Sequence, residues 1–543
     1  MDDLLSWLRL GESLEALGRP RDALAAYREL MEGLDRALPS ARRQDLQLDL
    51  QALYQRPMER AAAIILEDGS RVPAEAAIES LLLVDAGRAR VLRHSFGGQM
   101  DGATVSGEAR ASRARALAAL KAAESAFDEQ VNSGDESAHL SRLRRRRDDL
   151  RTQLEESDRL LEESSGGGEA HLVDDLSLIQ ESLEETTALV HYLLGEEEVR
   201  AWVVTRDVVR AHRLRISPRG LERMVKKYLD GLRAPETAFS LGLGLEAHPS
   251  ALARKLHEVL LGPFSREIDG RTRLVIVPDG VLHFVPFECL SPPGREPGRW
   301  DELEYLIERM SVVTLPSLGQ LQRGEIARRR TSSLVAFAAS EESVEGRVLD
   351  ELSHVEGELD FLAPLFPKAR VLRGGEATEA AYRRWAGTAT HLHLAGHAEV
   401  DDGSPAYSGL VLSSGEDGRA GQLLHAREVR HVPLRCELVM LSACSTGLGP
   451  LHRGEGALSL ARSFLAAGAD AVVMSLWRVL DSSTARFAHD FYRALHDGRS
   501  RVDALRDAKL GFLRAGRGGT DDRLAHPWFW APFVLTDTRL VRE

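Results

Sequence analysis

The chain has 543 residues, 43% of them hydrophobic and 28% charged, so it is too long for one hydrophobic core and predicts a soluble protein of roughly two to four domains. Its net charge of −13 argues against nucleic acid as a direct partner, and no stretch approaches the ~18 apolar residues of a membrane span. The small, odd number of cysteines (Cys289, Cys436 and Cys444) and an N-terminus without signal-peptide features predict a cytoplasmic protein with no disulfide framework.

Residues 1–100 are predicted to form a helical region. Seven residues in its first part fall at the spacings of a tetratricopeptide repeat: Trp7, Leu10, Gly11, Leu14, Gly18, Ala23 and Tyr27. Pro20 opens the second helix of this repeat, and we expect Gly11 and Ala23 to be small because the two helices cross closely there. Residues 44–94 continue the helical pattern without the repeat signature, and one repeat cannot bury its apolar face alone.

Residues 101–168 are predicted to form a helical hairpin and a linker. Leucines and other apolar residues recur at a spacing of three and four on both arms: Leu117, Leu120, Phe127, Val131, Leu140, Leu143, Leu150, Leu154 and Leu161. This spacing is typical of an antiparallel coiled coil, with a turn at 132–135 and a flexible break at 164–168. The basic run at Arg142 and Arg144–Arg147 is expected to be a solvated helix face, and the hairpin is either a structural arm or a partner-binding one.

Residues 169–330 change to a pattern of strands and helices. We expect strands at 188–194, 201–205, 208–214 and 274–277, with helices at 218–232 and 250–261. Cys289 lies near His283 in a largely apolar segment, and we expect it to be a buried core residue rather than a nucleophile.

Residues 331–543 alternate regularly between strands and helices. The expected strands are 334–338, 369–372, 392–396, 409–412, 421–424, 438–443, 471–476 and 530–535, and the expected helices are 352–365, 376–385, 456–467 and two more ending at residue 513. This alternation predicts an α/β fold with a mostly parallel sheet covered on both faces.

Two of these short apolar runs end at reactive side chains. The first, at 392–396, stops at His397, and the second, at 438–443, stops at Cys444. Ligands and chemistry gather beyond the carboxyl ends of parallel strands, so the two side chains are predicted to lie side by side there. A thiol is a strong nucleophile only as the thiolate, and an imidazole with a pKa near neutrality is a suitable base. One His and one Cys alone are also compatible with purely structural roles.

The wider sequence resembles the CHAT family, caspase-like cysteine peptidases of clan CD. Leu392–His397 and Leu438–Cys444 match the two clan signatures, the first loosely because His393 interrupts the run. Further family-like segments lie at 274–290, 454–469, 475–477 and 526–533. The resemblance covers about residues 175–540. It implies a caspase-like peptidase domain at 331–543, a non-catalytic pseudo-caspase lobe at 169–330 and a repeat-bearing helical companion, with no metal or organic cofactor.

The resemblance implies roles for particular residues. Cys444 is the expected nucleophile and His397 the general base and then acid, while the backbone N–H groups of Cys444 and Ala398 are expected to receive the oxyanion. Ala398 stands where many clan members have Gly, but it still offers its N–H. Asp401 and Asp402 are candidates to orient the imidazole, although clan members commonly work as a dyad.

By resemblance to caspases, the substrate is expected to bind as an added strand. Three residues at the end of the expected strand 471–476 and just after it are candidates to line the groove, namely Ser475, Trp477 and Arg478, with a core role as the alternative for Trp477. An acidic pocket for Arg or Lys before the cut would come from Glu455 or Asp481, unless these are ordinary helix-surface residues. Other nearby residues are candidates to shape the pocket or to be structural: Ser442, Ser445 and Thr446 for the pocket, His391 and His393 as structural residues.

We therefore expect a cysteine endopeptidase that cleaves a protein substrate and is controlled by a protein partner on the helical arm. One alternative is a catalytically silent caspase-like scaffold that acts through protein–protein contacts. Another is an acyl transferase that uses the same thioester chemistry.

Overall fold

The structure is a computed structural model, and it describes most of the helical arm and of the α/β region. The described residues are 2–37, 44–68, 73–96, 176–240, 249–294, 300–321, 332–340, 352–399, 407–415, 420–443, 460–477, 480–519 and 521–539, with the shorter pieces 115–116, 119–120, 123, 141–147, 149–150, 152–154, 343–344, 347–349, 451–452 and 456–457. The predicted turn at 132–135 and linker at 164–168 lie outside them.

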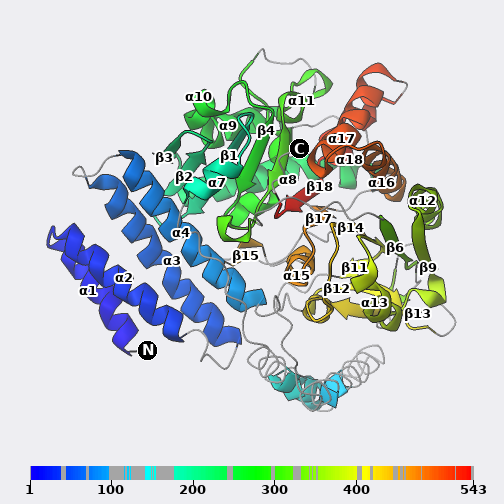
Figure 1. Ribbon diagram of the computed structural model, residues 1–543, viewed down its shortest axis with the longest axis horizontal. Coiled ribbons are helices and arrows are strands. Elements are labelled where there is room, and N and C mark those ends of the chain that lie inside the picture. The colour runs from blue at the N-terminus through cyan, green and yellow to red at the C-terminus, as the bar shows by residue number, and fades with distance from the viewer. Residues whose placement is uncertain are drawn as a thin grey trace.

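Four helices form the N-terminal arm, which lies beside the α/β region (Figure 1). They are α1 (Asp2–Ala16), α2 (Pro20–Ala37), α3 (Gln44–Glu67) and α4 (Pro73–Phe96). A Cβ atom added at Gly11 would lie 2.4 Å from the ring of Tyr27, and Ala23 is fully buried. The predicted close crossing of the first two helices is therefore confirmed. Of the predicted hairpin, Leu120, Leu150 and Leu154 are buried together.

One eleven-stranded sheet runs through the α/β region, in the order β3-β2-β1-β4-β5-β18-β17-β14-β10-β6-β9. Its strands are β1 (Thr187–Leu194), β2 (Val199–Val204), β3 (Val209–Arg213), β4 (Arg273–Val277), β5 (Ser311–Thr314), β6 (Ser333–Ala338), β9 (Lys368–Arg373), β10 (His391–Gly396), β14 (Leu438–Ala443), β17 (Ala471–Ser475) and β18 (Phe533–Asp537). β9, β6, β10, β14 and β17 are mutually parallel, and β18 is antiparallel to β17 but parallel to β5. The strands of both predicted lobes thus join in one sheet, which reverses direction at β18, and the predicted domain boundaries stay predictions.

Two smaller sheets and the remaining helices surround the large sheet. A five-stranded sheet contains β11 (Ala398–Glu399), β12 (Gly409–Ser413), β13 (Ala420–His425), β7 (Ser343–Val344) and β8 (Arg347–Val348), and β15 (Leu451–His452) pairs with β16 (Gly456–Ala457). The α-helices of this region are α7 (Ser177–Ser182), α8 (Pro218–Ser240), α9 (Ser250–Leu260), α10 (Ser265–Ile268), α11 (Leu306–Arg309), α12 (Val355–Leu362), α13 (Glu379–Trp385), α14 (Ala426–Val429), α15 (Leu460–Ala466), α16 (Asp481–His496), α17 (Arg501–Gly518) and α18 (Pro527–Trp530). Short 3-10 turns connect several of these elements, among them η3 (Gly280–Phe284), η4 (Phe287–Cys289) and η6 (Leu318–Gln320).

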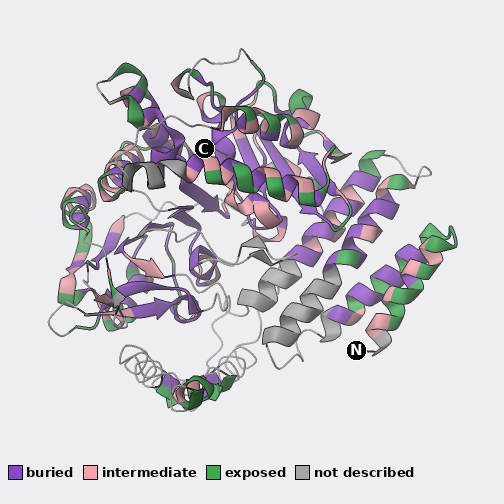
Figure 2. Ribbon diagram, turned by 180° about the vertical axis from the view of Figure 1, so that it is seen from behind, coloured by how far each residue is buried: buried purple, intermediate pink, exposed green. Residues whose placement is uncertain are grey.

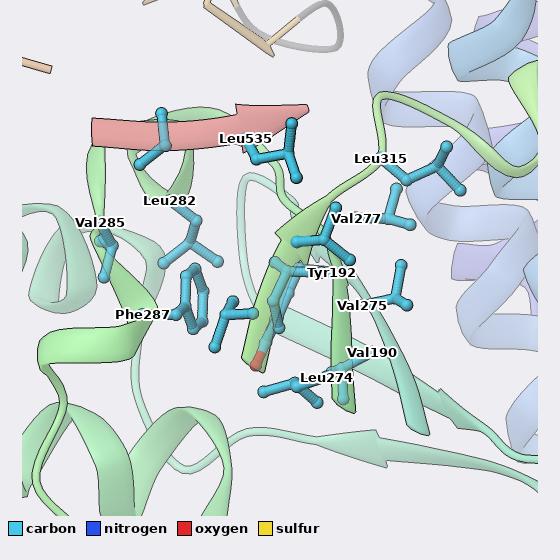
Figure 3. Close-up of a cluster of buried hydrophobic side chains, with 14 of the residues drawn as sticks. Val190, Tyr192, Leu274, Val275, Val277, Leu282, Val285, Phe287, Leu315 and Leu535 are labelled. Atoms are coloured by element: carbon cyan, nitrogen blue, oxygen red, sulfur yellow. The ribbon is translucent and has the colours of Figure 1, made fainter. Parts of the chain in front are cut away.

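The inner strands of the sheet are buried on both faces, as the sequence predicts (Figure 2), while the edge strands β3 and β9 are partly exposed. Alternate residues of β14 enter two different cores: Leu438 and Met440 belong to one cluster, Val439 and Leu441 to the other. The first core continues into residues 169–330, called the preceding lobe below, where the ring centroids of Tyr192 and Phe287 are 5.8 Å apart. Figure 3 shows these two side chains within the cluster. This two-sided burial confirms the predicted mostly parallel α/β sheet.

Among the predicted elements whose bounds differ from the structure, two have a clear local cause. The helix expected at 456–467 begins only at Leu460, because Gly456 pairs with His452 in the hairpin β15–β16. The strand expected at 530–535 begins at Phe533, because the helix α18 comes first, with Pro527 in its first turn and the His526 ring accepting a hydrogen bond from Trp528 N. Among the described helices, none has the length and apolar composition that a bilayer span requires.

Candidate active site

The strands that precede His397 and Cys444 are direct neighbours in the large sheet. β10 and β14 are parallel, and their register runs from His391 opposite Leu438 to Gly396 opposite Ala443, a constant offset of 47 residues (438 − 391 and 443 − 396). His397 and Cys444 have the same offset (444 − 397) and each comes directly after its strand. Cys444 itself lies outside the described residues.

The chain leaves the large sheet at Gly396. A Cβ atom at this position would lie 2.5 Å from the carbonyl oxygen of Ala339, so only a residue without a side chain fits. His397 follows as a half-buried residue, and its carbonyl oxygen accepts a hydrogen bond from Val411 N at 3.0 Å. The backbone of His397 is therefore held between the large sheet and β12.

Ala398 enters the five-stranded sheet directly after His397. It is half-buried in β11 and pairs with Leu410 of β12. Asp401 and Asp402, the candidates for orienting the imidazole, lie outside the described residues. The next described residue, Tyr407, packs against Leu120, Leu150 and Leu154 of the predicted helical hairpin.

The predicted substrate-binding residues begin at the end of β17, next to β14. Ser475 closes this strand as a buried residue, opposite Phe533. The side chain of Trp477 is also buried, with 1% exposure, and its indole N–H donates to the carbonyl of Trp528 at 3.2 Å. Arg478 lies outside the described residues. In the described conformation the Trp477 indole thus fills the core, which was the alternative that the sequence left open.

The two acidic candidates are in different situations. Asp481 opens α16, where its Oδ2 accepts a hydrogen bond from His354 N at 2.6 Å and lies 3.1 Å from His354 Nδ1. This contact connects the start of α16 to the start of α12. Glu455 lies outside the described residues, as do the pocket candidates Ser445 and Thr446.

The other two cysteines are in the core. Cys289 is fully buried and Cys436 has 1% exposure. Burial raises the pKa of the Cys289 thiol, so its reactive thiolate is disfavoured. The prediction that Cys289 is a core residue is confirmed.

The neighbouring histidines of β10 are also partly or wholly enclosed. His393 is fully buried, and burial together with the nearby Arg501 lowers the pKa of His391 to about 4. A neutral, packed imidazole is what the predicted structural role of His391 requires.

The sequence patterns did not identify a buried carboxylate that packs against both β10 and β14. The carboxylate of Glu358, on α12, contacts Ser442 and His393, one from each of the two strands. The sequence pattern predicts a structural role for His393 and makes Ser442 a candidate for the pocket, and nothing in the pattern of a helix 84 positions earlier could identify Glu358 as the partner of Ser442.

A separate cavity lies between α15, β5 and β18. Its lining includes His283, Thr314, Arg462, Met474 and Leu535, and none of the predicted catalytic or substrate-binding residues. No group of His, Cys, Asp and Glu side chains within the described part of the chain could hold a metal ion.

Comparisons with known proteins point to one family. The CHAT domain model matches residues 250–537. Tetratricopeptide repeat protein 28 of Homo sapiens is 24% identical over 332 residues, and its Mus musculus counterpart is 25% identical over 337 residues. Each match covers 52% of this chain but 13% of the relative, so the chain spans a small part of the length of these proteins.

Two solved structures share a distant likeness with this chain. One is the Saccharomyces cerevisiae separase–securin complex, with a TM-score of 0.49 at 11% identity, covering 95% of this chain and 37% of that one. The other is the complex of the pro- and mature domains of Porphyromonas gingivalis RgpB, with a TM-score of 0.34 at 11% identity, covering 54% and 70%. Likenesses this distant indicate no function for the chain.

Proposed function

The chain belongs to the CHAT domain family, and from this premise we propose that it is a cysteine endopeptidase with Cys444 as nucleophile and His397 as general base. The observation that carries the proposal is the register of β10 and β14. Because Gly396 is opposite Ala443 in neighbouring parallel strands, the next residue of each strand is the proposed member of the dyad. Both members then belong to one edge of one sheet, where α/β folds gather their chemistry.

The proposed reaction proceeds through a thioester. His397 takes the proton of the Cys444 thiol, and the sulfur attacks the carbonyl carbon of the scissile peptide bond. The backbone N–H groups of Cys444 and Ala398 donate to the oxyanion that forms. When the intermediate collapses, the C–N bond breaks and His397 gives its proton to the leaving amine. A water molecule, deprotonated by His397, then attacks the thioester, which releases the acid and restores the thiol.

The substrate is proposed to bind as an extended segment beyond the end of β17. β17 is paired on both sides, by β14 and β18, so strand addition would use the backbone of the residues that follow Ser475. With its indole in the core, Trp477 would contribute its backbone, next to Arg478. For a basic side chain before the cut, Glu455 is the better acidic candidate, since Asp481 already holds His354.

We further propose that a protein partner on the helical arm controls the peptidase. The arm is joined to the preceding lobe by buried charges: Asp85 of α4 accepts hydrogen bonds from Leu318 N at 2.7 Å and Gly319 N at 3.0 Å. Arg88 donates to the carbonyl of Tyr192 at 2.8 Å and pairs with Asp279 at 3.3 Å. These contacts make α4 a rigid attachment through which an event on the arm could reach the α/β region.

The contacts between α4 and the preceding lobe lead on to the segment that follows Cys444. Asp279 immediately precedes η3, and η3 contacts the hairpin β15–β16. That hairpin begins seven residues after Cys444 (451 − 444). This continuity supports control of the site through the arm. Full cleavage of the target by the purified chain, without any second component, would remove the proposed control.

A second function, a catalytically silent scaffold, is favoured by the relatives that match this chain. They are named for their tetratricopeptide repeats, and arrays of such repeats present extended binding surfaces. In that case the helical arm would be the working part and the caspase-like region a platform.

Labelling with a thiol-reactive peptide probe, followed by peptide mapping, separates the two functions. For the peptidase we expect Cys444 to be modified at least ten times faster than Cys289 and Cys436, which are buried and serve as internal controls. His397→Ala should remove this preference, whereas His496→Ala, which changes a histidine at the end of α16, should keep it. Equal, slow modification of all three cysteines in the native chain would favour the scaffold.

A further inference from the structure

A buried carboxylate joins the two strands that lead to the proposed dyad. Glu358 of α12 has 4% exposure, and both of its oxygens are within hydrogen-bond distance of the Ser442 hydroxyl, at 2.9 and 3.0 Å. One of the same oxygens, Oε1, lies 3.1 Å from His393 Nε2. Ser442 belongs to β14 and His393 to β10, so one side chain on a covering helix contacts both strands.

The donors and acceptors of this group fit one consistent arrangement. The Ser442 hydroxyl has a single proton and donates it to the carboxylate, which accepts only. The Tyr492 hydroxyl lies 3.3 Å from His393 Nδ1, and burial, together with the charge of Glu358, raises the pKa of Tyr492, so the phenol keeps its proton and can donate. His393 then carries its own proton on Nε2 and directs it toward Glu358, although at an angle that makes the contact electrostatic rather than an aligned hydrogen bond.

This group is not itself a nucleophilic site. In a serine hydrolase the imidazole stands between the hydroxyl and the carboxylate, whereas here the carboxylate stands between Ser442 and His393. Ser442 also has 6% exposure and His393 none, so a substrate carbonyl has no access. The chemistry of the group is to hold its own members in place.

We infer that Glu358 is a positioning residue that fixes the carboxyl ends of β10 and β14 relative to each other, an inference that rests on the proposed dyad. Ser442 stands two residues before Cys444, and His393 four residues before His397 (444 − 442 and 397 − 393). A shift of either strand would change the sulfur–nitrogen distance, and misplacement by an ångström is costly in catalysis. Tying both strands to one rigid group opposes such a shift.

The helix that carries Glu358 is itself held in place. His354, just before α12, donates its backbone N–H to Asp481 at the start of α16. Tyr492 of α16 then reaches back to His393. Glu358 is thus held in place by α12 and α16 together. Asp481, a predicted specificity residue, connects the starts of these two helices.

The matching control is a second buried carboxylate, which lies at the opposite ends of the parallel strands. Asp537, at the end of β18, is 2% exposed and pairs with Arg501 at 2.8 Å. It stands opposite Ala471, the first residue of β17, far along the strands from the edge that follows Ala443. Asp537→Asn therefore perturbs a buried ion pair in the same sheet without touching the strand ends that precede the dyad.

The experiment measures the rate at which iodoacetamide alkylates Cys444 in the full chain. The variants are Glu358→Gln, which keeps the shape and the hydrogen-bonding capacity, Glu358→Leu, which keeps the volume alone, and Ser442→Ala. We expect Glu358→Leu and Ser442→Ala to slow alkylation at least tenfold and threefold, while Glu358→Gln stays within threefold of the native rate. Each rate is measured at a temperature where circular dichroism shows the variant to be folded.

The outcomes separate this inference from the proposed function. If the native chain shows no preferential alkylation of Cys444, the dyad is wrong and the positioning role falls with it. If the native chain is alkylated at Cys444 but Ser442→Ala and Glu358→Leu react at the native rate, the dyad stands and the positioning role is overturned. If Asp537→Asn slows the reaction as much as Glu358→Leu does, the effect is general destabilisation, and the inference is overturned as well.

Discussion

At the scale of single residues, Gly396 determines how the backbone leaves β10 just before His397. The carbonyl oxygen of Ala339 would be 2.5 Å from an added Cβ atom, and Ala339 N donates to the carbonyl of Ala395 at 2.9 Å, so β6 and β10 close together at this point. The backbone cannot yield there without breaking the sheet. A glycine is thus required by contact with the neighbouring strand.

We expect Gly396→Ala to destabilise the protein by about 1–3 kcal/mol, because an inserted methyl group must push backbone atoms apart. It should also slow alkylation of Cys444, since the imidazole moves with the strand end. Thermal unfolding and iodoacetamide labelling measure the two effects. The control is Gly357→Ala in α12, where an added Cβ meets nothing within 4 Å and helix propensity favours Ala by about 1 kcal/mol. Native stability and labelling in Gly396→Ala would contradict the argument.

At the scale of elements, a buried ion pair joins the C-terminal helices to the preceding lobe. Lys509 of α17 pairs with Glu288 of η4, and the two side chains are 0% and 6% exposed. Their sequence separation is 221 residues, and the pair lies beside the buried Cys289. The pair therefore holds together elements from both halves of the large sheet.

We expect Lys509→Met to destabilise the protein by about 3–5 kcal/mol, because it leaves the Glu288 carboxylate buried without its cation. Adding Glu288→Leu should restore most of this lost stability, because the double variant no longer buries an unpaired charge. Urea unfolding of both single variants and the double variant gives the coupling energy. The exposed pair Lys255–Glu258, at 2.8 Å, is the comparison, and its coupling should stay below about 1 kcal/mol. Equal couplings for the two pairs would refute this difference.

The elements also show which features sequence patterns can predict. β10 and β14 were predictable because short apolar runs closed by small residues leave few alternatives to a buried strand. The helix expected from residue 456 was placed too early, because the apolar period continues through a segment where Gly456 instead pairs with His452. The contact between Glu358 and Ser442 was beyond prediction, since it depends on how α12 packs over the sheet and leaves no trace in either local pattern.

At the scale of the whole molecule, the helical arm is attached to the lobe through buried polar contacts rather than through an apolar seam alone. In addition to Asp85 and Arg88, Glu59 of α3 accepts a hydrogen bond from Glu196 N at 2.6 Å, in the turn between β1 and β2. A Cβ atom at the neighbouring Gly195 would lie 2.0 Å from the Glu59 carboxyl carbon, so the turn approaches the helix as closely as backbone can. Such contacts are strongly directional, and they fix the angle of the arm.

This attachment predicts how the molecule unfolds. Asp85→Ala leaves the N–H groups of Leu318 and Gly319 without their acceptor and removes the carboxylate that lies 3.2 Å from His191 Nε2, which should cost about 3 kcal/mol or more at this attachment. We therefore expect calorimetry to resolve two unfolding transitions in this variant, with the arm unfolding first. In the native chain the arm and the α/β region should unfold closer together in temperature. Asp22→Ala is the matched control, because Asp22 pairs with Arg19 on the exposed surface of the same arm and contributes less than about 1 kcal/mol. If Asp85→Ala and Asp22→Ala unfold alike, the arm is held by its apolar contacts, and control of the strand edge through α4 loses its physical basis.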